Sequence, residues 1–264
     1  MFRIIEFTCE EATLFGSLDE GISTAGLLIV SGGNEIRIGA HRGMAELAQK
    51  IAASGYPVFR FDRRGIGDSE GENNGFEASG PDIDAALAAF RAACPHISRV
   101  VAFGNCDAAT ALVLHDNNAD GLVLANPWVI ERTDELPPTA AIKDRYTRRL
   151  RDPKAWASLV TGKIDISKAI RGLRRISSIR NETSGLCGRF AKALVTDIRP
   201  TKILLATGDN TAIAFADAWN RPEFEPARNR ANISIVRFDS VSHSFASDDD
   251  FALLVKALTD ALAQ

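Results

Sequence analysis

The sequence predicts an α/β fold with a doubly wound, mostly parallel β-sheet, and two observations lead to this prediction. Apolar runs at residues 25–30, 100–103 and 121–125 show no polar alternation, which is typical of strands buried on both faces. Helical spacing of apolar residues follows most of these runs after short connections, and strands that alternate with helices in this way form parallel sheets. With 264 residues, 45% of them hydrophobic, the chain can bury one large core.

The first half of the chain is expected to begin with a hairpin at the sheet edge and to continue with alternating strands and helices. Met44, Leu47 and Ile51 recur at helical spacing before Gly55, which predicts a helix there. The expected elements of this half are strands at residues 2–9, 11–18, 25–30 and 58–62, the helix before Gly55, and a helix at residues 83–94.

The stretch at residues 100–110 has the layout of a nucleophile elbow, a strained turn that holds a nucleophile clear of the sheet. An apolar run stops at Gly104 and continues as Ala-rich helical sequence from Ala108, with Cys106 at the tip of the turn. The small residues let strand and helix approach closely, and a helix amino-terminus favours thiolate over thiol. An isolated cysteine is more often a small buried hydrophobe. The strand-turn-helix context and the partners described below favour a nucleophile.

The alternation stops after the sixth expected strand, at residues 121–125. Residues 131–198 contain apolar spacing typical of helices and no convincing strand. We therefore expect residues 1–130 and 199–264 to form the core, and residues 131–198 to form a helical cap, or lid, inserted after that strand. The elements expected in this half are cap helices around residues 142–150, 153–159 and 166–176, strands at residues 202–209 and 233–238, and helices at residues 212–219 and from Asp249.

Two further residues follow strands at the edge where functional groups of an open parallel sheet gather. Asp209 lies at the end of one strand and His243 in the loop after the next, which gives the chain order Cys106, Asp209, His243. Nucleophile, acid and histidine follow this order in the α/β-hydrolase arrangement. His243 would take a proton from Cys106, and Asp209 would orient the imidazole. The alternative for Asp209 is a turn-forming or helix-capping role, and His41 is a rival to His243.

The glycine-rich loop after the third strand is a candidate oxyanion site. Acyl transfer needs two preorganised N–H donors for the oxyanion of the tetrahedral intermediate. The expected pair is the backbone N–H of Asp107 and an N–H near Gly33 or Asn34. The alternative is that the Gly32-Gly33 pair only turns the chain.

Two segments resemble one group of the α/β-hydrolase superfamily, the exosortase A system-associated hydrolase 1 group. They are SGGNEIRIGAHR (residues 31–42) and RFDRRGIGDSEG (residues 60–71), and the resemblance covers most of the chain. It implies an α/β-hydrolase fold with Cys106, Asp209 and His243 as the triad. The group is named for bacterial exosortase and exopolysaccharide loci, which implies no defined substrate. The sequence departs from the superfamily pattern in having cysteine for serine; dienelactone-hydrolase-like members also use cysteine.

Composition narrows the class of protein further. The four cysteines are widely scattered, without a C-x-x-C pair or clustered histidines, which argues against a disulfide framework, a zinc site or another metal site. No cofactor is expected, and a reduced, cytoplasmic setting fits this cysteine usage. The amino-terminus is strand-like rather than a secretory signal, and no apolar run approaches the roughly 18 residues of a membrane span.

The expected cap carries an excess of basic residues. Residues 131–198 contain 15 Lys and Arg against 8 Asp and Glu, a balance of +7 in a chain whose net charge is −3. This favours an anionic substrate, such as a phosphopantetheine thioester or an acidic saccharide ester, although solvated helix faces explain it equally well. Nucleic acid is disfavoured because no recognition motif is present. The residues expected to contact substrate are His41, Arg42, Trp128 and Trp156.

These observations favour a hydrolase that acts on small-molecule esters or thioesters through an acyl-Cys106 intermediate, as a thioesterase or carboxylesterase. The same triad supports acyl transfer to a sugar or amine if the cap excludes water. A non-catalytic binding protein of the same fold is a third interpretation, because fold alone does not establish function.

Overall fold

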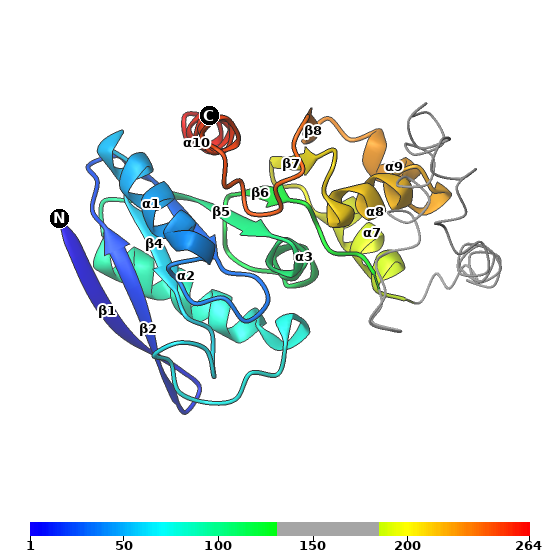
Figure 1. The fold of residues 1–264 in the computed structure, drawn as a ribbon. Helices are drawn as coiled ribbons and strands as arrows, with labels where there is room; N and C mark the ends of the chain where they lie inside the picture. Colours follow the sequence, from blue (N-terminus) through cyan, green and yellow to red (C-terminus); the bar gives the residue numbers. More distant parts are fainter. Residues whose placement is uncertain (131–184) are drawn as a thin grey trace, which may run out of the picture.

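The computed structural model describes residues 1–130 and 185–264, which form an eight-stranded sheet with helices on both faces (Figure 1). The strand order is β1-β2-β4-β3-β5-β6-β7-β8. β2 pairs antiparallel with β1 and β4, and the other neighbouring strands pair in parallel, so the predicted mostly parallel sheet is confirmed. The strands are β1 (Phe2–Cys9), β2 (Ala12–Asp19), β3 (Ala25–Val30), β4 (Val58–Phe61), β5 (Arg99–Asn105), β6 (Gly121–Ala125), β7 (Thr201–Ala206) and β8 (Ile233–Phe238).

The helices divide into two layers because successive side chains of a strand point to opposite faces. In β3, Leu27 and Ile29 pack in the core cluster shared with α1 and α10, whereas Leu28 and Val30 pack in the cluster shared with α2, α3, α7 and α8. Both faces of the strand are therefore covered, which explains its unbroken apolar run. The helices are α1 (Gly43–Ala53), α2 (Gly80–Ala93), α3 (Asp107–Leu114), α7 (Leu186–Thr196), α8 (Asn210–Trp219), α9 (Glu225–Arg228) and α10 (Asp248–Leu262).

The parallel strands bring their carboxyl ends to one edge of the sheet. β3 and β5 are neighbours there, although β4 comes between them in the chain, so the strand order reverses at this point. Such a reversal opens a crevice outside the strand ends, where α/β proteins place their ligands. The loops that leave β3, β5, β6 and β7 all begin at this edge.

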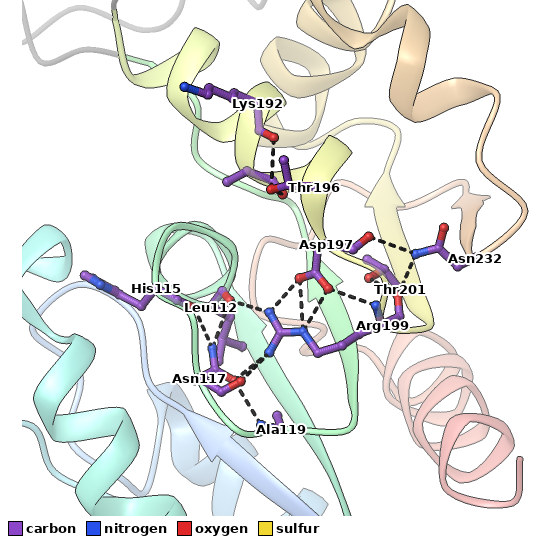
Figure 2. Close-up of polar contacts among 11 residues, drawn as sticks. Leu112, His115, Asn117, Ala119, Lys192, Thr196, Asp197, Arg199, Thr201 and Asn232 are labelled. Carbon is purple, nitrogen blue, oxygen red and sulfur yellow. Dashed lines mark hydrogen bonds and ion pairs between the residues drawn. The ribbon is translucent and has the colours of Figure 1, made fainter.

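A cluster of polar contacts centred on Arg199 fixes the point where the chain enters β7 (Figure 2). The Arg199 guanidinium pairs with Asp197, and their side chains are only 15% and 8% exposed. It also donates to the backbone oxygen and side-chain oxygen of Asn117, at 3.0 and 2.8 Å. Asn232 donates to the carbonyl oxygens of Asp197 and Arg199 on the other side. The cluster thus joins the α3–β6 connection to the start of β7.

Most of the expected cap lies outside the described residues, including the three helices expected around residues 142–150, 153–159 and 166–176. The described end of that segment is α7, a helix that the sequence analysis did not anticipate. Its Phe190 and Leu194 are fully buried in the cluster shared with α3 and α8. In the described ranges no helix is long and apolar enough to cross a membrane.

Candidate active site

Cys106 lies at the tip of the turn between β5 and α3, with the backbone angles φ 61° and ψ −124°. Non-glycine residues rarely adopt a positive φ, and such strain is concentrated at functional sites. The turn also requires Gly104, because a Cβ there would lie 2.7 Å from the backbone of Ala108. Hydrogen bonds hold the strained residue in place: the Cys106 N–H donates to Ala125 (2.9 Å), and its carbonyl accepts from the Trp128 N–H (3.2 Å).

Asp209 combines the two roles that the sequence left open for it. One oxygen, Oδ1, accepts the backbone N–H groups of Thr211 and Ala212 at 3.0 and 2.9 Å, which caps α8. The other, Oδ2, lies 3.0 Å from Nδ1 of His243. A single buried carboxylate therefore starts a helix and orients the imidazole.

His243 hydrogen-bonds Asp209 through Nδ1, which leaves Nε2 for Cys106, and both residues line the same cavity. The bond to Asp209, followed by the interaction with Cys106, raises the pKa of His243 to about 10. Burial alone would raise the pKa of Asp209, but the hydrogen bonds from His243 and from the α8 backbone hold it below its usual value. At neutral pH the site therefore contains an imidazolium between a carboxylate and a sulfur atom.

Two asparagines that the sequence analysis missed tie the elbow to the histidine loop. Asn105, directly before Cys106, donates through Nδ2 to the carbonyl oxygen of His243 (3.0 Å). Its Oδ1 accepts from Nδ2 of Asn126 (3.3 Å), and Oδ1 of Asn126 accepts the backbone N–H of Ala206 (3.0 Å). Asn126 is fully buried at the end of β6 with φ 42°. The sequence signal for this pair is that two consecutive strands each end in an asparagine, at the edge of the sheet where His243 also lies.

The loop after β3 is held by charged side chains on both sides of Gly33, which has φ 55°. Its N–H donates to Oδ1 of Asp107 at 2.7 Å, and its carbonyl accepts from the guanidinium of Arg63. The side chain of Asn34 accepts a hydrogen bond from Asn73 instead (2.9 Å). The structure thus brings the three expected oxyanion residues together, with the Asp107 carboxylate on the Gly33 N–H.

Two hollows meet at Gly33. A cavity of about 140 Å³ is lined by Cys106 and His243 together with Phe103 and Met44. A groove of about 760 Å³ is lined by residues that include Asp107, Phe76, Trp128 and Arg189. Gly33 belongs to both linings, and the consecutive residues Cys106 and Asp107 line the cavity and the groove respectively.

The other predicted contact residues are placed differently. Trp128 is half-buried and lines the groove, whereas Trp156 lies outside the described residues. His41 and Arg42 are exposed on a short turn at Ala40–Arg42 and are absent from the described lining of both hollows. It is therefore His243, and not its rival His41, that meets Cys106.

The remaining cysteines occupy different surroundings. Cys9 and Cys94 are buried, and burial raises the pKa of both thiols, to about 11 for Cys9, where Asp82 adds to the effect. Cys187 on α7 is half-buried. Across residues 1–130 and 185–264, no group of three or more His, Cys, Asp or Glu side chains could hold a metal ion.

Comparisons with known proteins place this chain in a wider group. The family model described as Serine aminopeptidase, S33 (Hydrolase_4) matches residues 23–199, and no curated protein sequence matches the chain. Among solved structures, an esterase from Pyrococcus furiosus has a TM-score of 0.67 at 16% identity, covering 98% of this chain and 92% of that one.

Two further solved structures are similar at TM-scores of 0.63. The α/β hydrolase GrgF from Penicillium sp. sh18 is 15% identical, with 98% of this chain and 97% of that chain covered. The protein Est1E from Butyrivibrio proteoclasticus, with ferulic acid bound, is 12% identical, with 98% of both chains covered. At these identities the likeness shows the fold, and the predicted α/β-hydrolase fold is confirmed.

Proposed function

Because the chain belongs to the Serine aminopeptidase, S33 family of α/β hydrolases, we propose that it cleaves ester or thioester bonds through an acyl-cysteine intermediate on Cys106. The observation that carries this proposal is that His243, hydrogen-bonded to Asp209, lines the same cavity as Cys106, and that the two neighbours raise the pKa of His243 to about 10. A histidine that stays protonated beside a sulfur atom stabilises the thiolate, which is the nucleophilic form of cysteine.

The proposed reaction has two steps. The Cys106 thiolate attacks the carbonyl carbon, and the backbone N–H groups of Asp107 and of Gly33 or Asn34 stabilise the oxyanion. The intermediate collapses, and His243 gives its proton to the departing alcohol or thiol. His243 then takes a proton from water, which attacks the acyl-cysteine and releases the carboxylic acid and the thiolate.

Several observations bear on the substrate. The similar Pyrococcus protein is an esterase, and the similar Butyrivibrio protein holds ferulic acid, which supports carboxylic esters as one substrate class. Residues 131–198, with 15 basic against 8 acidic residues, would form the cap and would favour anionic leaving groups such as phosphopantetheine. From the resemblance to the exosortase-associated group we further propose a link to exopolysaccharide loci, and from the scattered cysteines a reduced, cytoplasmic setting.

Intact-mass analysis after brief incubation with an activated acyl thioester tests this proposal. We expect one acyl adduct, lost on standing in water and absent in Cys106→Ala. Cys187→Ala is the matched control, because it removes another half-buried thiol and should still acylate. Turnover by Cys106→Ala, or no adduct with any acyl donor, would favour a different nucleophile or a binding protein. An adduct that decays faster when a sugar or amine is added would indicate acyl transfer.

A further inference from the structure

The side chain of Asp107 occupies a position that the proposed chemistry needs. Its Oδ1 accepts the Gly33 N–H at 2.7 Å, across the gap between the elbow and the β3 loop. A Cβ at Gly32 would lie 2.7 Å from the same oxygen, so the loop backbone passes directly against this carboxylate. Asp107 is the first residue of α3, yet its carboxylate reaches a residue 74 positions away in the chain.

The Asp107 carboxylate makes the Gly33 N–H a poor binding site for other anions. An N–H bonded to an anion is not available to a second acceptor, and a fixed negative charge repels another at hydrogen-bonding distance. The oxygen of a tetrahedral intermediate and the carboxylate of a product acid are both anionic. Neither can share the Gly33 N–H with Asp107, so one must displace the other.

Arg63 supports the loop from the opposite side. Arg63 is only 3% exposed, its guanidinium donates to the Gly33 carbonyl, and its Nε has no hydrogen-bond partner among the described residues. Burial lowers the pKa of Arg63, and the charges of Asp107 and Asp82 oppose that shift. The cation remains behind the loop when the Asp107 carboxylate moves, so the site becomes positive where the oxyanion forms.

We propose that Asp107 is a specificity-determining residue that keeps free anions off the Gly33 N–H and yields this donor only to the oxyanion of an acyl group bound covalently to Cys106. This inference rests on the proposed hydrolase function. It implies that the enzyme releases its carboxylic acid product readily, because the product anion competes with a tethered carboxylate. It also implies a preference for acyl groups without a negative charge next to the carbonyl.

Two substitutions separate charge from hydrogen bonding. Asp107→Asn removes the charge but keeps an oxygen that can accept from Gly33, whereas Asp107→Ala removes both. Asp116→Asn is the matched control, since Asp116 is an exposed aspartate just beyond the other end of α3. Thermal unfolding of all variants shows whether each remains folded, because a first-turn aspartate also stabilises its helix.

The first measurement compares alkylation of Cys106 by iodoacetate and by iodoacetamide, which differ in charge. We expect the ratio of the two rates to rise about tenfold in Asp107→Asn and Asp107→Ala, and to stay at the wild-type value in Asp116→Asn. A ratio that Asp107→Asn leaves unchanged would overturn the proposal.

The second measurement does not depend on a reactive cysteine. Acetate, used as a stand-in for the product, is titrated while the Gly33 amide is followed by NMR. In wild type we expect little response, and in Asp107→Ala a Kd for acetate at least about tenfold lower. Equal acetate responses in wild type and Asp107→Ala would refute the role of Asp107, whatever the turnover. If wild type binds acetate more weakly than Asp107→Ala, as expected, but shows no turnover of esters or thioesters, the proposed hydrolysis is wrong and the role of Asp107 stands.

Discussion

Asp209 shows how one residue can serve both folding and chemistry. Its Oδ1 caps α8 and its Oδ2 holds His243. In Asp209→Asn the amide oxygen can still cap the helix, so we expect stability close to wild type and a loss of about 100-fold or more in kcat/KM. In Asp209→Ala we expect the same catalytic loss and a further drop of about 1 kcal/mol in the free energy of unfolding. Urea denaturation and steady-state kinetics separate the effects; equal stability of the two variants would contradict the double role.

The raised pKa of His243 predicts an unusual dependence on pH. The pKa of His243 is about 10 in the folded protein against 6.5 in the unfolded chain. The charged histidine therefore contributes fully to the stability of the fold below pH 6.5. This contribution is lost as the pH rises through about 10. We therefore expect kcat/KM to fall at alkaline pH only near 10, and the fall to move toward neutral pH in Asp209→Asn. NMR titration of the His243 ring measures this directly; a wild-type midpoint near 6.5 would exclude the imidazolium pair.

For single residues, the sequence could predict which side chains lie close together but not which hydrogen bonds their atoms form. Cys106, Asp209 and His243 each follow a strand, and parallel strands end at one edge, so order and spacing were sufficient to bring them together. The hydrogen bond from Gly33 to the Asp107 side chain depends on a rotamer and on a loop conformation. Neither leaves a periodic signal in the sequence.

Among the elements, β5 contacts the histidine loop as well as leading into Cys106, the proposed nucleophile. Asn105 donates to the carbonyl oxygen of His243, and Asn126 supports Asn105 from β6. We expect Asn105→Ala to lower the free energy of unfolding by about 1–2 kcal/mol and to lower kcat more than it raises KM, because the His243 backbone loses a donor. Asn118→Ala, on an exposed residue, is the control. An unchanged kcat would mean that the loop is held by other contacts.

The helix α7 shows why one element escaped prediction. Leu186, Phe190 and Leu194 recur every four residues and are buried, which is the spacing of an amphipathic helix. Strand patterns are absent from the segment, so the sequence predicts it to be part of the cap. In the structure Phe190 packs against Phe215 of α8, with ring centroids 5.8 Å apart. Periodicity identifies a helix, but its partner is decided by the tertiary structure.

For the molecule as a whole, the Arg199 cluster joins two lengths of chain (Figure 2). Arg199 and Asp197 lie after the undescribed segment, and Asn117 lies before it. Removing one partner of a largely buried ion pair leaves an unpaired charge, so we expect Arg199→Ala to lower the free energy of unfolding by about 3–5 kcal/mol. Arg199→Lys should recover only part of this, because lysine cannot reproduce the forked geometry. Calorimetry measures both; a loss within about 1 kcal/mol for Arg199→Ala would show that the pair is dispensable.

The overall architecture was the most predictable property of the chain. Buried parallel strands need long apolar runs, and the alternation with helices fixes their direction, so the hairpin, the central strands and the helices α1, α2, α3, α8 and α10 all follow from pattern. The short helix Glu225–Arg228 was missed because four residues are too few to show a period.

The pairing of β6 with β7 has one further consequence. The proposed nucleophile and oxyanion loop belong to residues 1–130, and the proposed acid and histidine belong to residues 185–264, so every residue of the proposed triad lies on one side or the other of the intervening stretch. We therefore expect that a homologous segment can replace that stretch while the proposed chemistry stays in place.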